Sequence, residues 1–114
     1  MYSRTFLITG ASKGIGLAVS QRFARAGHRV VGIARNASAP DFPGTLVPAD
    51  LGNRESAAQA LVDLTSRFTF DGLVNNVATV LPQRLGEIDL DSFDETLRVN
   101  LHPAILATQA LLPG

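Results

Sequence analysis

The stretch Thr9-Gly10-Ala11-Ser12-Lys13-Gly14-Ile15-Gly16 decides the fold of this chain. Before it, residues 4–9 form a short β-branched and apolar run, which predicts a buried strand. After it, apolar residues recur at every fourth position from Ile15, which predicts an amphipathic helix over residues 14–26. Glycines between a strand and a helix let a ligand approach the backbone, and the N–H groups at the helix start favour phosphate.

The order of residues in this turn disfavours a nucleoside triphosphatase. In the phosphate loop of such enzymes, a lysine and then a serine or threonine follow the last glycine. Here Lys13 comes before Gly14, and Gly16 is followed by Leu17. The turn therefore favours a phosphate-bearing ligand without the loop that those enzymes use.

The rest of the chain alternates between strand and helix patterns. Strands are expected over residues 29–34, 45–49 and 70–75, and helices over residues 54–68 and from a cap at Asp91 or Ser92 to about Leu112. Pro48 has no N–H to donate to a sheet, so the strand over 45–49 is expected at an edge. This alternation predicts an α/β fold, with a parallel sheet covered by helices on both faces.

Composition limits the classes of protein to consider. A chain of 114 residues has room for one domain, and 46% hydrophobic with 18% charged residues is a globular composition. No apolar run is long enough for a membrane span, and the first residues do not resemble a secretory signal. The chain has no cysteine, which excludes disulfides and thiolate sites and suits a cytoplasmic protein. Two histidines without clustered carboxylates predict no metal site.

The net charge of zero hides an uneven distribution along the chain. Residues 1–38 contain six cationic side chains and no acid, whereas residues 39–114 contain all ten acids and four arginines. A neutral total gives no general attraction to nucleic acid. A basic first part favours an anionic ligand there, although Arg22, Arg25 and Arg29 are expected to be ordinary surface charges.

Four motifs in order make the sequence resemble the short-chain dehydrogenase/reductase family. The glycine turn resembles the family pattern TGxxxGxG, and Asp50-Leu51 resembles its adenine-binding aspartate. Asn75-Asn76-Val77-Ala78 resembles its NNAG motif, and Asn100 resembles the asparagine of its next helix. The resemblance implies a Rossmann-type fold, in which residues 1–114 form the N-terminal portion of an NADP-binding domain and stop after the fourth strand and its following helix.

The resemblance also implies a role for each matched residue. The cofactor-binding residues would be Gly10, Ser12, Lys13, Gly14, Ile15 and Gly16 along the pyrophosphate and adenosine ribose, Asp50 and Leu51 at the adenine, and Asn76, Val77 and Ala78 below the nicotinamide-side ribose. Val99 would bind the cofactor as well. Ala78 stands where the family has glycine, and Val77 stands where it has alanine, so this segment departs from the family pattern. Asp50 has a second interpretation, because an aspartate there can cap the helix that begins near Arg54.

Asn100 is the one matched residue with a catalytic role. In the family this asparagine supports a proton relay toward the catalytic lysine. Pro103 lies in the same predicted helix, where its missing N–H and its ring are expected to kink or loosen the backbone. Asn100 therefore has a second interpretation, in which it satisfies backbone groups that the proline leaves free.

Two cations favour NADP(H) over NAD(H) as the cofactor. A dinucleotide fold that selects NAD usually carries an acid at the end of its second strand. Here that strand ends at Arg35, and no acid precedes Asp41. Arg35 can meet a 2′-phosphate with paired hydrogen bonds, and Lys13 stands where NADP-preferring relatives carry a second basic residue.

The residues that would perform the reaction are missing from the chain. The family transfers hydride between nicotinamide and a carbonyl or alcohol substrate, using a tyrosine, a lysine four residues on and a serine. The tyrosine here is Tyr2 and the lysine is Lys13, and neither matches those positions. The chain alone is thus predicted to be inactive, as part of a longer reductase. A non-catalytic NADP(H)-binding module and a structural domain without ligand stay open as alternatives.

A sheet that stops here would leave residues 72–75 as an apolar edge. Such an edge invites pairing with another chain. The family resemblance also implies that the last helix packs against a partner subunit. We therefore expect a homo-oligomer, or association of the chain, and no nucleic-acid or membrane partner.

Overall fold

Four strands form one parallel sheet in the order β3-β2-β1-β4 in the computed structural model, which describes residues 3–36, 38–77 and 83–112. The strands are β1 (Thr5–Thr9), β2 (Arg29–Ala34), β3 (Thr45–Pro48) and β4 (Gly72–Val74). Leu7 of β1 lies opposite Val31 of β2 on one side and Leu73 of β4 on the other. The predicted edge position of the strand that carries Pro48 is confirmed, because β3 pairs only with β2 in this sheet.

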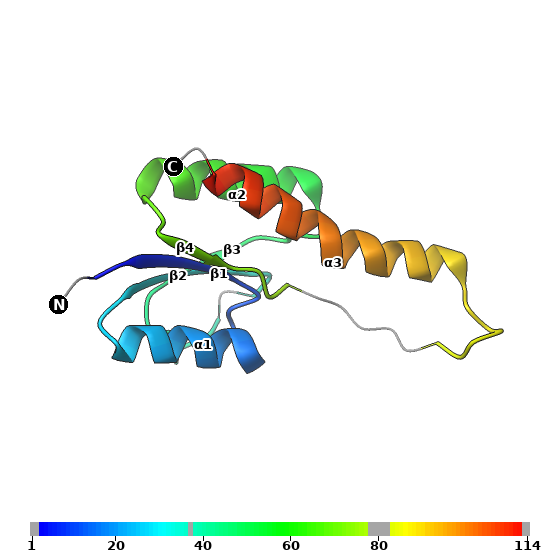
Figure 1. Cartoon of the computed structure of the whole chain (residues 1–114), viewed down its shortest axis with the longest axis horizontal. Helices are drawn as coiled ribbons and strands as arrows, with labels where there is room; N and C mark the ends of the chain where they lie inside the picture. The colour runs from blue at the N-terminus through cyan, green and yellow to red at the C-terminus, as the bar shows by residue number, and fades with distance from the viewer. Residues whose placement is uncertain (1–2, 37, 78–82, 113–114) are drawn as a thin grey trace.

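Helices cover both faces of the sheet, which confirms the predicted α/β fold of Rossmann type. Helix α1 (Gly14–Arg25) lies on one face, and α2 (Arg54–Arg67) and α3 (Leu90–Leu111) lie on the other (Figure 1). Helix α1 connects β1 to β2 and α2 connects β3 to β4, which are crossovers of the kind that parallel strands require. In the part of the chain that the structure describes, no helix is long and apolar enough to cross a membrane.

The sheet separates two apolar layers. Leu7 packs with the larger cluster beneath α2 and α3, whereas its neighbour Ile8 packs with the smaller cluster beneath α1. Successive side chains of a strand point to opposite faces, so one short run fills both layers. Both side chains are fully buried, which confirms the prediction of a strand buried on both faces.

Two helix starts differ from the alternatives that the sequence left open. Asn53 caps α2, because its side chain accepts a hydrogen bond from the Ser56 amide at 3.0 Å. The interpretation of Asp50 as the cap of this helix is therefore wrong. Asp89 caps α3, so the expected cap at Asp91 or Ser92 is also wrong.

The hydrogen bonds at the start of α3 explain why the cap was predicted at the wrong residue. The Asp89 carboxylate accepts hydrogen bonds from the Ser92 amide at 3.2 Å and the Ser92 hydroxyl at 2.7 Å. Ser92 is thus the partner of the cap, three residues into the motif, rather than the cap itself. These hydrogen bonds to Ser92 lower the pKa of Asp89 below its ordinary value.

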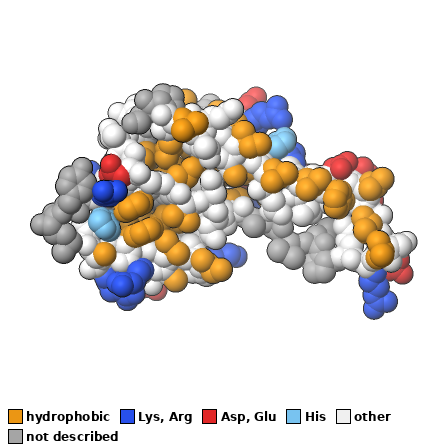
Figure 2. All heavy atoms as spheres, viewed as in Figure 1, with side chains coloured by type: hydrophobic (Ala, Val, Ile, Leu, Met, Phe, Trp, Pro, Cys, Tyr) orange, Lys and Arg blue, Asp and Glu red, His pale blue; other side chains and the backbone are white. Residues whose placement is uncertain are grey.

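Helix α3 changes character along its length. It runs without interruption through Pro103, so the expected loosening does not end the helix. Its second half packs on the larger cluster, with Ala107 fully buried. Its first half, residues 90–101, extends away from the sheet and carries apolar side chains that are exposed, such as Leu101 at 54% (Figures 1 and 2).

Candidate functional site

A cavity of about 640 Å³ opens where the four parallel strands end. Open α/β sheets bind ligands in the crevice outside the carboxyl ends of their strands. The volume lies within the roughly 300–1,000 Å³ that is typical of small-molecule sites. The lining comes from the segments that follow each strand and from α3, and consists of Gly10, Ser12, Lys13, Gly14, Ile33, Ala34, Arg35, Asn36, Ala49, Asp50, Leu51, Gly52, Asn76, Val77, Glu95, Arg98 and Val99.

The glycine turn after β1 depends on each of its glycines for a different reason. Gly10 and Gly14 have φ angles of +63° and +58°, a region that other residues adopt at a cost. Gly16 is buried, and a Cβ there would lie 2.2 Å from the Gly10 carbonyl oxygen. Gly16 thus lets the first turn of α1 lie directly against the end of β1.

A buried threonine ties the glycine turn to the segment after β4. The Thr9 hydroxyl oxygen accepts hydrogen bonds from the Asn76 amide at 2.9 Å and the Val77 amide at 3.2 Å. The Asn76 side chain donates in return to the Gly10 carbonyl at 3.1 Å. These contacts join β1 and β4 at the mouth of the cavity. Sequence reasoning missed the role of Thr9, which only its place at the start of the glycine motif could have suggested.

The start of α1 is open toward the cavity. Lys13 occupies the cap position, and its side chain makes no hydrogen bond to the first turn of the helix. No acid lies in that turn either. The first N–H groups of a helix lack partners within the helix and attract anions. Lys13 and Arg35 both line the cavity and are exposed, which places two positive charges beside this helix start.

The loop after β3 forms the opposite end of the cavity. The Asp50 side chain is exposed there, and its Oδ1 accepts a hydrogen bond from the Gly52 amide at 2.9 Å. Leu51 turns inward and is buried in the larger apolar cluster. Val99 of α3 lines the same end. This end therefore pairs a carboxylate acceptor with apolar surface.

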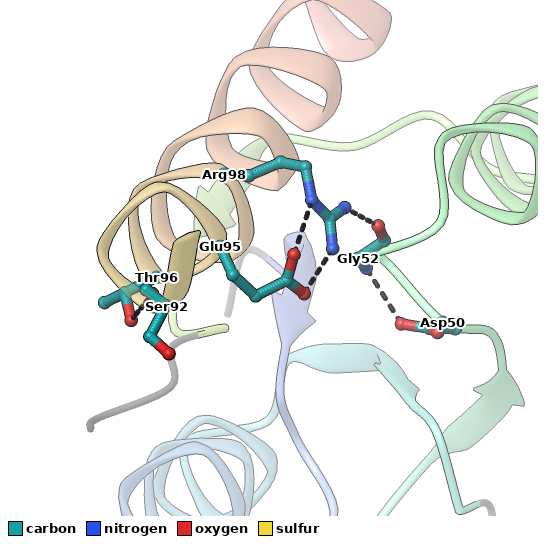
Figure 3. Close-up of polar contacts among 6 residues, drawn as sticks. All are labelled: Asp50, Gly52, Ser92, Glu95, Thr96 and Arg98. Atoms are coloured by element: carbon teal, nitrogen blue, oxygen red, sulfur yellow. Dashed lines mark hydrogen bonds and ion pairs between the residues drawn. The ribbon is translucent and has the colours of Figure 1, made fainter. Parts of the chain in front are cut away.

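Sequence reasoning missed Arg98 and Glu95, which also line this end of the cavity. The Arg98 guanidinium makes paired hydrogen bonds to the Glu95 carboxylate, at 2.6 Å from Nη2 and 3.2 Å from Nε, and Nη1 donates to the Gly52 carbonyl (Figure 3). The hydrogen bond to Glu95 raises the pKa of Arg98. Opposite charges three residues apart on a helix predict such an ion pair. The contact with Gly52 leaves no local signal in the sequence.

Comparison with known proteins assigns the family. The family model described as short chain dehydrogenase matches residues 4–114. The chain belongs to this family. Human L-xylulose reductase is 36% identical over 117 residues, and the match covers 97% of this chain and 47% of that protein. The rhamnolipids biosynthesis 3-oxoacyl-[acyl-carrier-protein] reductase of Pseudomonas aeruginosa is 34% identical, over 96% of this chain and 47% of that protein.

Solved structures of short-chain dehydrogenases have the same fold. A short-chain dehydrogenase from Streptomyces avermitilis matches with a TM-score of 0.89 and 26% identity, over 98% of this chain and 44% of that chain. The Pseudomonas aeruginosa RhlG/NADP active-site complex matches with a TM-score of 0.86 and 29% identity, over 96% and 47% of the two chains. The chain spans about half the length of the curated relatives that it matches.

Membership of the short-chain dehydrogenase family confirms the resemblance that the four motifs indicated. The structure brings most of the matched residues to one cavity, from Gly10 at one end to Asp50 at the other. Ile15 and Gly16 do not line it: the Ile15 side chain is 75% exposed, and Gly16 lies beneath the turn. Asn100 lies half-buried on α3 and is not among the lining residues. Ala78 lies outside the described residues.

Proposed function

We propose that this chain binds NADP(H) as the cofactor-binding part of an oxidoreductase that acts on a carbonyl or alcohol substrate. The cavity at the carboxyl ends of the strands carries this proposal, because an uncapped helix start, two cations and a carboxylate all line it. The family and its reductase relatives support the reaction type. When bound, the nicotinamide would supply or accept the hydride.

The described residues fit an elongated dinucleotide phosphate. In the proposal, the N–H groups at the start of α1 meet the pyrophosphate, and Gly10 and Gly14 let it approach the backbone. Asp50 accepts a hydrogen bond from the adenine amino group, with Leu51 and Val99 beside the ring. The segment that begins at Asn76 and Val77 lies at the far end, where the nicotinamide ribose would pass, with Ala78 and the relay role of Asn100 following from the family resemblance alone.

Charge at the end of β2 favours NADP(H) over NAD(H). Arg35 follows β2 directly and lines the cavity together with Lys13. Within the described ranges, the ion pairs are Arg67–Asp63 and Arg98–Glu95, so neither lining cation is neutralised by an acid. An arginine fork can hold a 2′-phosphate with two parallel hydrogen bonds.

Titration of the full chain with NADPH and NADH by calorimetry tests the cofactor. We expect tighter binding of NADPH, and an Arg35→Ala variant that loses about tenfold or more in affinity for NADPH but little for NADH. Arg25→Ala is a matched control, because Arg25 is an exposed arginine in the last turn of α1. Binding of neither dinucleotide would overturn the proposed function. Equal losses for both dinucleotides would overturn the choice of NADP(H).

Residues 1–114 do not contain the tyrosine–lysine pair that would transfer the proton in the proposed reaction. The chain contains one tyrosine, Tyr2, and Lys13 is its lysine, so no tyrosine is followed by a lysine four residues on. We propose that residues 1–114 bind the cofactor and that the tyrosine, lysine and serine belong to the part that the longer relatives have in addition. The same observation favours a second candidate, a non-catalytic NADP(H)-binding module. Turnover of a carbonyl substrate by a chain of 12.1 kDa would contradict both.

We also propose that the protein assembles as a homo-oligomer in the cytoplasm, with no nucleic-acid or membrane partner. The exposed apolar side chains of the first half of α3 support an association, because exposed apolar patches of this kind mark interaction sites. The absence of cysteine is consistent with a reducing compartment.

A further inference from the structure

Arg98 connects two parts of the cavity wall that are far apart in the sequence. Its guanidinium donates to the Gly52 carbonyl across a separation of 46 residues. Glu95, one helical turn earlier, holds the other side of the guanidinium with two hydrogen bonds. Glu95 therefore holds the Arg98 guanidinium in place on α3, in the orientation in which it contacts the loop (Figure 3).

The backbone of Gly52 connects Arg98 to Asp50 through two hydrogen bonds. Its carbonyl accepts from Arg98, while its amide donates to Asp50 Oδ1 at 2.9 Å. The Asp50 amide in turn donates to the Ser56 hydroxyl at 3.0 Å. One residue thus links the guanidinium to the carboxylate that the proposed function assigns to the adenine.

The buried Leu51 and the hydrogen bonds of the Asp50 backbone to Asn53 and Ser56 hold the main chain of this loop, but they do not fix the direction of the Asp50 carboxylate. The Asp50 side chain is exposed, so water competes for its hydrogen bonds and packing does not set its direction. Exposed ion pairs such as Arg98–Glu95 contribute little stability by themselves. The Arg98–Glu95 pair differs from other exposed ion pairs because Arg98 also donates a hydrogen bond to the Gly52 carbonyl in the loop.

We propose that Arg98 is a positioning residue for base recognition: by holding Gly52, it sets the Asp50 carboxylate to select an amino group on the purine. This rests on the proposed function, in which the cavity takes NADP(H). Arg98 then influences which purine base the cavity selects, whereas Arg35 and Lys13 bind the 2′-phosphate of the cofactor. A guanidinium that only stacks on the base would not distinguish one purine from another in this way.

The test compares NADPH with its hypoxanthine analogue, which lacks the adenine amino group. In the full chain we expect NADPH to bind roughly tenfold more tightly, the difference that a hydrogen bond to a charged group makes. In Arg98→Met the ratio of the two affinities should fall toward one. Adding Asp50→Ala to that variant should lower the ratio no further, because both changes remove the same recognition.

Arg67→Met is the matched control. Arg67 forms an exposed ion pair with Asp63 on α2 at 3.1 Å, but donates to no loop carbonyl within the described residues. In Arg67→Met, the ratio of the affinities for NADPH and its hypoxanthine analogue should equal that of the unmodified chain. Arg98→Lys, which keeps a single donor for the Gly52 carbonyl, should restore part of the ratio. Should Arg98→Met fail to fold, Glu95→Gln serves instead, because it loosens the guanidinium while the helix is kept.

Three outcomes would overturn the inference while the proposed function stands. The ratio could stay unchanged in Arg98→Met, the two affinities could fall together, or Arg67→Met could lower the ratio equally. An unchanged ratio in Glu95→Gln would count against it in the same way. Binding of neither ligand by the unmodified chain would overturn the proposed function itself, so the two failures can be told apart.

Discussion

The glycine turn after β1 and the first half of α3 differ in where their partners lie. In the turn, Thr9, Asn76 and the Gly10 carbonyl hold one another through short hydrogen bonds, and Gly16 leaves no free space. In residues 90–101 of α3, the apolar side chains face outward, and Arg98 makes a single hydrogen-bond connection to the loop after β3. The polar groups of the turn thus find partners within the described residues, whereas the first half of α3 leaves apolar side chains exposed.

The glycine turn stabilises the fold of the chain, whereas the exposed apolar side chains of α3 contribute little to its stability. Changes in the turn should cost stability directly, because backbone and buried polar groups cannot move aside. Changes on the exposed stripe should cost little stability and should instead alter association. Four predictions test the contrast.

Gly16→Ala should have the largest effect. The new methyl group would meet the Gly10 carbonyl oxygen at 2.2 Å and the Asn76 Nδ2 at 2.7 Å, so the turn and α1 must separate. We expect a loss on the order of 3 kcal/mol in the free energy of unfolding by urea denaturation. Gly14→Ala is the control, since nothing lies within 4 Å of a Cβ there and only its φ of +58° is strained. Its expected loss is about 1 kcal/mol, and equal losses would contradict the steric explanation.

Thr9→Val should have the next largest effect. The side chain is 1% exposed, and valine keeps its shape but removes the acceptor of the Asn76 and Val77 amides. Leaving buried N–H groups without a partner costs about 1–3 kcal/mol. Thr9→Ser keeps the hydroxyl and should lose clearly less in the same unfolding measurement. A serine variant as unstable as the valine variant would show that the methyl group, and not the hydroxyl, matters here.

Leu101→Gln should leave stability within about 0.5 kcal/mol, because the side chain already meets water in the single chain. If residues 90–101 form a contact between copies, the same change should raise the monomer fraction in sedimentation velocity at a fixed concentration. Val62→Gln is the control, as Val62 is an exposed apolar residue on α2. A sedimentation profile unaffected by Leu101→Gln would count against a contact through this stripe.

Acid should loosen the start of α3, and this is the smallest effect. The pKa of Asp89 is lowered in the folded chain by its hydrogen bonds to Ser92. Its carboxylate therefore contributes stability above the ordinary pKa of aspartate, and this is lost as the pH falls through the lowered value. Amide exchange in the first turn of α3 should rise over that acidic range, and Asp89→Asn should remove the pH dependence. Identical pH profiles for the two proteins would contradict the assignment.

The sequence predicted those features that short-range patterns encode. The glycine turn, the apolar spacing from Ile15 and the missing N–H of Pro48 all act through their own neighbours. A parallel sheet with helices on both faces and an edge position for β3 could therefore be predicted, whereas the full strand order required the structure. The predicted start of α3 was wrong because three residues that are able to cap a helix stand close together there. Asp89, Asp91 and Ser92 are each able to cap, and the geometry of the carboxylate selects Asp89.

Contacts between distant segments could not be predicted. Arg98 reaches Gly52 because α3 packs against α2, and Gly52 lies in the loop that leads into α2. Nothing near either residue in the sequence indicates the other. The same holds for Thr9 and Asn76, which meet because β4 pairs with β1. For the site, the sequence named the segments that surround the cavity, while the hydrogen bonds that fix their shape required the structure.

The strand order also sets a sequence of events in folding. Strand β1 is synthesised before the other three strands, and it pairs on one side with β2, where Thr5 lies opposite Arg29. Its other side waits for β4, and the Thr5 amide meets Asp71 across 66 residues. Closing the longer loop costs more entropy and slows the step that needs it. The unit β1-α1-β2 should therefore form first on the ribosome, and the cofactor cavity should close only when β4 arrives.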